Sequence, residues 1–133
     1  MKAIILAAGQ GTRLKKYTEN LPKGMLEFKG KTPIERQLET YRECGIEDII
    51  IVTGYASDKI TYDGVKYYLN EKYAETNMVE SLMCAKDEFN DDVIVSYSDI
   101  IFKKRLLEGM MESKDDFACA VDDNWKEIGR AHV

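Results

Sequence analysis

Two kinds of hydrophobic pattern alternate along this chain. Continuous apolar runs predict five strands, at residues 2–8, 49–52, 65–69, 92–97 and 117–121. Between them, apolar residues that recur every three or four positions predict three helices, at residues 32–44, 77–89 and 103–113. This alternation predicts an α/β fold in which a mostly parallel sheet is covered by flanking helices.

The first predicted helix has start and stop signals. Thr32 is a good N-cap, Pro33 suits the first helical position, and Glu35 completes a capping box. Gly45 falls just past the end, where helices commonly finish on glycine. On one face of this helix, Ile34, Leu38 and Tyr41 recur at helical spacing.

Further core positions follow from the same patterns. We expect the third helix to turn four apolar side chains inward, those of Leu106, Leu107, Met110 and Met111. Cys84 and Cys119 lie within apolar patterns and are expected in the core.

The first strand runs into a turn that contains two glycines. Gly9 and Gly11 have no Cβ, so backbone amides there can approach a bound anion. Arg13 and Lys23 add positive charge suited to a polyphosphate. Leu14 replaces the third glycine of the dinucleotide fingerprint, and the spacing is not that of a P-loop. A tight turn with two solvated cations is the simpler alternative.

A carboxylate, Asp99, follows the fourth predicted strand. Ligands of parallel sheets bind beyond the carboxyl ends of the strands, where the glycine turn and Gly54 also fall. We therefore expect these segments to converge. A carboxylate at that place can hold Mg²⁺, although a lone aspartate after a strand is also typical of a turn or an N-cap.

Composition narrows the class of protein. The chain has 133 residues, which suggests one domain, and a net charge of −5, which argues against a nucleic-acid binder. No apolar stretch approaches the roughly 20 residues that span a bilayer. The three cysteines are widely spaced and suit a reducing cytoplasm. With His132 as the one histidine, a histidine triad or a multi-histidine zinc site is not expected.

The glycine turn carries a more specific resemblance. Residues 9–14, Gly-Gln-Gly-Thr-Arg-Leu, followed by Pro-Lys at 22–23, resemble the signature of nucleotidyltransferases that join a nucleoside triphosphate to a phosphorylated acceptor. Residues 30–34, 51–55 and 75–82 are similar to the CTP-using branch. That branch includes choline-phosphate cytidylyltransferases and relatives that activate phosphonates.

The resemblance implies a Rossmann-like nucleotidyltransferase fold and a Mg²⁺-dependent reaction. CMP from CTP would pass to a phosphorylated acceptor such as phosphocholine or a phosphonate, with release of pyrophosphate. Two alternatives stay open: a sugar-1-phosphate nucleotidyltransferase that uses another triphosphate, and a nucleotide-binding regulatory module without turnover. The implied setting is cytoplasmic, without nucleic acid or a membrane span.

Site residues are implied in the same way. Arg13 and Lys23 are the expected catalytic residues, and Asp99 is the expected metal ligand, with Ser98 in place of the family's usual glycine. The expected nucleotide-binding residues are Leu6, Ala7, Ala8, Gly9, Gly11, Thr12, Arg13, Asn77 and Ser81. The alternatives are that Asn77 is only an N-cap and Ser81 only a tolerated helical serine.

We expect residues 1–125 to form the N-terminal portion of a nucleotidyltransferase domain and residues 126–133 to be a tail unlike the family. Because the family is usually longer, this chain would be a fragment, a truncated form or one part of a homo-oligomer. Asp122 to Trp125 could contribute to a cage for a quaternary ammonium group.

Overall fold

The computed structural model describes residues 1–124, except for the side chains of residues 13–15. Within this part of the chain, four strands form one parallel sheet in the order β3-β2-β1-β4. The strands are β1 (Lys2–Ala7), β2 (Ile49–Thr53), β3 (Val65–Leu69) and β4 (Val93–Tyr97). The helices are α1 (Pro33–Glu43), α2 (Met78–Cys84) and α3 (Lys104–Glu112). Short 3₁₀ segments lie at Thr12–Tyr17, Lys23–Met25, Ser57–Lys59 and Lys86–Glu88.

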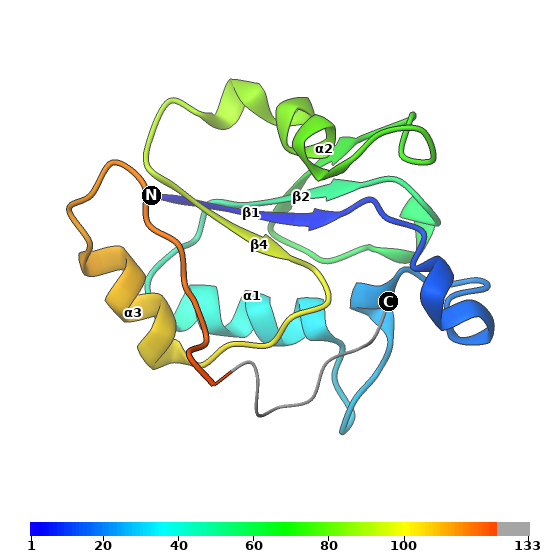
Figure 1. Ribbon diagram of the computed structural model, residues 1–133, viewed down its shortest axis with the longest axis horizontal. Coiled ribbons are helices and arrows are strands. Elements are labelled where there is room, and N and C mark those ends of the chain that lie inside the picture. The colour runs from blue at the N-terminus through cyan, green and yellow to red at the C-terminus, as the bar shows by residue number, and fades with distance from the viewer. Residues whose placement is uncertain (125–133) are drawn as a thin grey trace.

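The sheet lies between two helical layers, which confirms the predicted α/β architecture. Figure 1 shows α2 on one face and α1 with α3 on the other. Alternate residues of β1 therefore enter different cores: Ile5 packs with Leu38 and Leu107, and Ile4 packs with Ala85. Because both faces are covered, β2 is buried at every position, as expected of a central parallel strand.

Helix α1 forms as its sequence signals predict. Thr32 Oγ1 accepts a hydrogen bond from the Glu35 amide at 3.1 Å, and Pro33 occupies the first turn. Ile34, Leu38 and Tyr41 are buried against the sheet. The helix ends before Gly45, whose φ of 82° favours glycine.

The predicted fifth strand at residues 117–121 is wrong. This segment forms no strand, and its apolar side chains Phe117 and Val121 are 86% and 75% exposed. Cys119, expected in the core, is exposed for the same reason. An apolar run forms a strand only where a neighbour completes its hydrogen bonds, and residues 1–124 provide none for this segment.

The prediction for α3 is wrong at one position, since Leu106 is exposed. Consecutive helical residues point about 100° apart, so Leu106 and Leu107 cannot both face the sheet. Leu107 is buried there, and Met110 and Met111, three and four positions later, are partly buried on the same side.

The helix predicted over residues 77–89 is shorter than expected. Helix α2 ends at Cys84, and the chain turns through the buried Ala85 into the 3₁₀ segment. That segment places Glu88 at the start of the sheet, where its carboxylate accepts hydrogen bonds from Lys2 at 3.2 Å and from Lys66 and Tyr68 at 2.9 Å. These bonds fasten the end of the α2 segment to β1 and β3.

Glu88 makes the stability of this fold depend on pH. Its hydrogen bonds, above all those from Lys66 and Tyr68, lower its pKa from 4.5 to about 2. Because the folded pKa lies below the unfolded one, the stabilisation is complete above pH 4.5 and is lost as the pH falls towards 2. We expect Glu88→Gln to lower the free energy of unfolding by about 2 kcal/mol at pH 7, as measured by urea denaturation, and by much less at pH 2.

The control for this prediction is Asp87→Asn, an exposed acid in the same 3₁₀ segment. It should change the unfolding free energy by less than about 0.5 kcal/mol at either pH. An equal effect of both substitutions, or an effect of Glu88→Gln that persists at pH 2, would contradict the assigned role of Glu88.

Candidate functional site

A pocket of about 350 Å³ opens at the carboxyl ends of β1 and β4, beside the start of α2. We call it the strand-end pocket. The ends of β1 and β4 and the loops around them contribute Leu6, Ala8, Gly9, Lys23, Tyr97, Ser98 and Asp99. The segment that leads into α2, together with α2 itself, contributes Tyr73, Thr76, Asn77, Met78 and Ser81. The glycine turn and Asp99 converge here, as the sequence predicts.

The end of β1 holds the loops on both of its sides. The Leu6 carbonyl accepts a hydrogen bond from the Ser98 amide at 3.0 Å, and the Ala8 carbonyl accepts one from the Tyr55 amide at 3.1 Å. Gly54 packs so tightly that a Cβ on it would lie 2.8 Å from the Ala8 carbonyl oxygen. The loops after β2 and β4 are therefore anchored to one strand end.

The two glycines of the turn serve different purposes. A Cβ on Gly9 would meet no protein atom within 4 Å, and its φ is not positive. Neither packing nor backbone conformation therefore requires glycine there, and the open space borders the pocket. Gly11 has a φ of +63°, and a Cβ on it would lie 2.6 Å from Cγ of Lys23. Gly11 thus lets the Lys23 side chain lie across the turn.

Lys23 and Asp99 form an ion pair at the mouth of the pocket, with Nζ and Oδ2 3.5 Å apart. Their side chains are 35% and 44% exposed, so water screens the pair and it contributes little to stability. Both groups remain open to a ligand. The pocket thus presents a cation and an anion side by side, which suits a phosphate group accompanied by a metal ion.

Close packing at Gly24 sets the position of this pair. A Cβ on Gly24 would lie 2.7 Å from side-chain atoms of both Ile34 and Ser98. The missing side chain lets the Lys23 segment rest against the residue that precedes Asp99. The space left by the missing Gly24 side chain is occupied in part by the Ser98 side chain.

Gln37 holds the other side of the Asp99 loop. This α1 residue is 1% exposed, and its Nε2 donates hydrogen bonds of 2.7 Å to the carbonyls of Tyr97 and Ile100. These carbonyls flank Asp99, so the loop is fastened to the core. Sequence analysis missed Gln37, because its role depends on a contact across 60 or more positions.

The orientation of Gln37 is fixed by a buried chain of hydroxyl groups. Tyr41 donates to Ser96 Oγ at 2.8 Å, and Ser96 donates to Gln37 Oε1 at 2.7 Å. Burial raises the pKa of Tyr41 to about 12, so its hydroxyl remains a donor near neutral pH. With Oε1 occupied as an acceptor, the Gln37 amide nitrogen must face the Asp99 loop.

Asn77 is the N-cap of α2, as predicted by the alternative to its nucleotide-binding role. Its Oδ1 accepts hydrogen bonds from the amides of Val79 at 3.0 Å and Glu80 at 3.3 Å. Asn77 nevertheless lines the strand-end pocket, so capping does not exclude ligand contact. Ser81, one turn later, is buried and also lines the pocket.

The structure brings together most of the expected site residues. Those that line the pocket are Leu6, Ala8, Gly9, Lys23, Asn77, Ser81 and Asp99. Ala7 belongs to the core on the α1 and α3 side of the sheet and does not line the pocket. Gly11 and Thr12 do not line it either. The Arg13 side chain and all of Trp125 lie outside what the structure describes. Sequence analysis assigned no role to four further lining residues, Tyr73, Thr76, Met78 and Tyr97.

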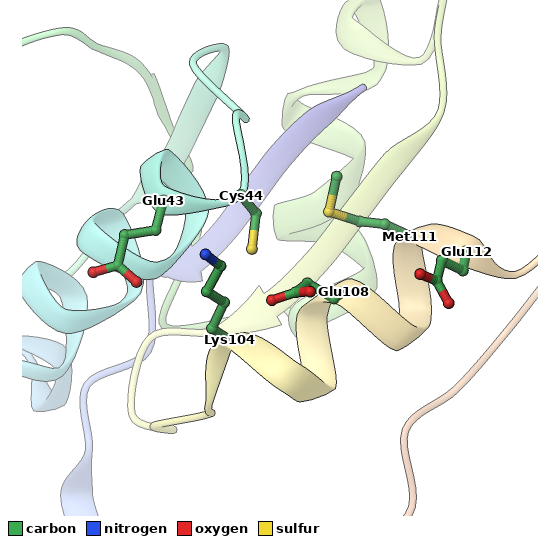
Figure 2. Close-up of a pocket in the computed structure, with 6 residues that line it drawn as sticks. All are labelled: Glu43, Cys44, Lys104, Glu108, Met111 and Glu112. Atoms are coloured by element: carbon green, nitrogen blue, oxygen red, sulfur yellow. The ribbon is translucent and has the colours of Figure 1, made fainter.

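A second hollow of about 320 Å³ lies between the end of α1 and α3. Figure 2 shows its residues: Glu43 and Cys44 come from the α1 end, and Lys104 and Glu108 come from α3. Burial raises the pKa of the Cys44 thiol, and Glu108 raises it further, which favours the protonated form. No motif identified in the sequence falls in this hollow.

The packing at Gly24 yields a prediction about stability. We expect Gly24→Ala to lower the free energy of unfolding by about 2 kcal/mol, because its methyl group would collide with Ile34 and Ser98. Gly109→Ala is the control, since a Cβ on that α3 residue would meet no atom within 4 Å. It should leave stability unchanged or raise it by up to about 1 kcal/mol. Equal midpoints for both variants in thermal unfolding would contradict the packing argument.

Comparison with known proteins identifies related sequences of known function. The chain is 38% identical over 139 residues to the CTP:phosphoglutamine cytidylyltransferase of Campylobacter jejuni, an alignment that covers 96% of this chain and 55% of that protein. It is 40% identical over 117 residues to the choline-phosphate cytidylyltransferase of Streptococcus pneumoniae, covering 85% and 51% of the two chains. The chain thus spans about half the length of the curated relatives it matches.

Comparison of structures gives the same result. A solved structure of the CTP:phosphocholine cytidylyltransferase from Streptococcus pneumoniae superposes with a TM-score of 0.72 and 41% identity, over 79% of this chain and 50% of that one. The family model described as the MobA-like NTP transferase domain matches residues 3–129. This chain therefore belongs to the MobA-like NTP transferase domain family.

Proposed function

We propose that this chain carries the nucleotide-binding core of an enzyme that transfers CMP from CTP to a small phosphorylated acceptor. The observation that carries the proposal is the strand-end pocket, where open space at Gly9 adjoins the Lys23–Asp99 pair. The choice of CTP is supported by the relatives, whose names specify cytidylyl transfer to phosphoglutamine or choline phosphate.

The groups around the pocket suit the parts of a nucleoside triphosphate. The space beside Gly9 allows phosphate oxygens to approach the backbone amides of the turn. Lys23 supplies a point charge for the phosphates, and Arg13 is proposed as a second cation on the leaving pyrophosphate. We place the nucleoside along Leu6, Ala8 and the wall formed by Asn77 and Ser81, as these residues line the same pocket.

The proposed reaction requires no strong general base. An acceptor phosphate oxygen, already anionic near neutral pH, attacks the α-phosphorus of CTP. A new P–O bond forms as the bond to the bridging oxygen breaks, and the electron pair leaves with pyrophosphate. Catalysis then depends on alignment of the reactants and on stabilisation of charge. Lys23 is suited to both tasks because its ammonium group lies at the pocket mouth.

We propose Mg²⁺ as the cofactor, on the basis of the donors present. Mg²⁺ commonly binds one or two carboxylates together with substrate phosphates and water. Asp99 offers one partly exposed carboxylate beside the proposed phosphate site, which fits that pattern. Residues 1–124 contain no group of three potential metal-ligating side chains, so the phosphates would supply further ligands. When bound, the metal would neutralise phosphate charge.

We also propose a reducing, cytoplasmic setting, because Cys44, Cys84 and Cys119 are all free thiols. No helix among residues 1–124 is long and apolar enough to cross a bilayer. Self-association into a homo-oligomer stays a prediction.

Calorimetry with CTP, UTP, GTP and ATP in the presence of Mg²⁺ tests the nucleotide directly. We expect CTP to bind most tightly. Pyrophosphate release with phosphocholine, 2-aminoethylphosphonate and sugar 1-phosphates then tests the acceptor. Tighter binding of another triphosphate, together with turnover of a sugar phosphate, would indicate the alternative transferase. Nucleotide binding without turnover by any pair would favour a regulatory module.

Lys23→Met should identify the contribution of the ammonium group. Methionine keeps an unbranched stem to lie over Gly11 while removing the charge, so the midpoint of thermal unfolding should change little. We expect kcat/KM to fall by about 30- to 1,000-fold, equivalent to 2–4 kcal/mol of transition-state stabilisation. The exposed Lys86→Met is the matched control. Comparable kcat/KM for both variants would exclude Lys23 from catalysis.

Gly9→Ala tests the open space without changing any charge. The added methyl group meets no protein atom, so the free energy of unfolding should stay within about 0.5 kcal/mol of the wild-type value. The same methyl group would obstruct phosphate approach, and we expect CTP to bind about tenfold more weakly, a loss of 1.4 kcal/mol. Unchanged CTP affinity measured by calorimetry would place the phosphates elsewhere.

A further inference from the structure

Behind the wall of the strand-end pocket lies a buried amide side chain, that of Asn70. It follows β3 directly and is 5% exposed. Its backbone amide donates to the Thr53 carbonyl at 2.8 Å, which extends the pairing of β2 and β3 by one bond. Asn70 itself does not line the pocket.

The orientation of this amide is fixed by a neighbouring backbone group. Asn70 Oδ1 accepts a hydrogen bond from the Lys72 amide at 3.0 Å. A backbone N–H can only donate, so the oxygen must face Lys72 and the nitrogen must face the other way. That nitrogen donates to Thr76 Oγ1 and to Ser81 Oγ, both at 3.0 Å.

The hydroxyl groups of Thr76 and Ser81 differ in whether their own protons are donated within the protein. Thr76 passes its proton to the Lys72 carbonyl at 2.8 Å, so its hydroxyl both accepts and donates within the protein. Ser81 accepts from Asn70, but its own proton has no acceptor among residues 1–124. Ser81 is 5% exposed and lines the pocket. The pocket is therefore the place where this proton can meet an acceptor, which points to one supplied by the ligand.

We propose that Asn70 is a positioning residue that makes Ser81 a hydrogen-bond donor to the nucleoside bound in the strand-end pocket. This inference rests on the proposed function, because the ligand it addresses is the nucleotide. Asn70 directs its own N–H to the Ser81 oxygen and so turns the Ser81 proton away from itself. The ligand must then offer an acceptor atom at that point.

Two kinds of atom on the nucleoside fit this requirement. One is shared by all pyrimidine nucleotides, namely the base O2 or a ribose oxygen. The other is N3 of the base, which is an acceptor in cytosine and carries a proton in uracil. The affinities of the Ser81→Ala variant for CTP and UTP distinguish the two cases. Only a hydrogen bond to N3 would make this substitution weaken CTP binding more than UTP binding.

Ser81→Ala removes the donor, and we expect at least tenfold weaker binding of CTP, as for loss of a hydrogen bond to a buried group. Asn70→Asp replaces the amide donor by a carboxylate that accepts from both hydroxyls. The Ser81 proton would then turn towards residue 70, and the pocket would face a lone pair. We expect a similar loss of CTP affinity from this change, although residue 70 does not line the pocket.

The double variant tests whether Asn70 acts through Ser81. If it does, Asn70→Asp combined with Ser81→Ala should bind CTP no more weakly than Ser81→Ala alone. Additive losses would indicate two independent effects and overturn the positioning role. Because a buried carboxylate can itself prevent folding, the same cycle with Asn70→Ala removes the donor without adding charge.

Two controls separate this effect from general changes. Asn90→Asp adds the same charge at an exposed position. Thr40→Val removes a hydroxyl that donates to the Arg36 carbonyl within α1. Both should bind CTP as the wild type does, and thermal unfolding of every variant establishes that each is folded.

The outcomes distinguish this inference from the proposed function. CTP binding by the wild type with a tenfold loss in Ser81→Ala and a non-additive double variant supports the inference, whether or not UTP is affected equally. CTP binding that Ser81→Ala leaves unchanged overturns the inference alone. If the wild-type chain binds no nucleotide at all, the proposed function fails and the inference fails with it.

Discussion

The central place of β1 in the parallel sheet determines where chemistry can occur in this molecule. Its residues pair with β2 on one side and with β4 on the other, so three strands end at one level. The carbonyl of Leu6, near the end of β1, and that of Ala8, just beyond it, accept hydrogen bonds from the amides of Ser98 and Tyr55 and so hold the loops after β4 and β2. Residues about 90 positions apart in the sequence, Gly9 and Asp99, thereby border one pocket. Parallel pairing, rather than any local motif, brings the glycine turn and the Asp99 carboxylate together.

The segments around the sheet ends are held by buried residues that do not line the pocket. Gln37 fastens the loop of Asp99 from below, and Glu88 fastens the segment that follows α2 at the far end of the sheet. The Lys23–Asp99 pair, by contrast, is exposed and adds little to stability. The buried contacts therefore stabilise the fold, while the partly exposed charges of Lys23 and Asp99 can exchange partners. Such separation is expected where charged groups must be oriented before the ligand arrives.

The sequence predicts the elements whose signals are local. Thr32 and Pro33 predict the start of α1, and the continuous apolar run of β2 predicts a buried strand without reference to the rest of the sequence. The Phe117 segment shows the limit, since this apolar run forms no strand and residues 1–124 offer it no partner strand. At the site, the glycine turn and Asp99 are predicted by position at strand ends. Gln37 and Asn70 are not, because their roles are hydrogen bonds made across the fold to atoms that carry no sequence signal.

The charge of the chain constrains how a nucleotide would be held. With a net charge of −5, the protein as a whole does not attract a triphosphate over long distances. Attraction must come from groups within a few ångströms, and at physiological salt charges beyond about 8 Å are largely screened in any case. The pocket supplies such groups on separate elements, with the Lys23 ammonium at its mouth and the Ser81 hydroxyl in its wall. In the proposed complex, the phosphates meet the first of these groups and the nucleoside meets the second. Because one nucleotide would engage both groups at once, the proposed function implies tighter binding of the whole nucleotide than of phosphate alone.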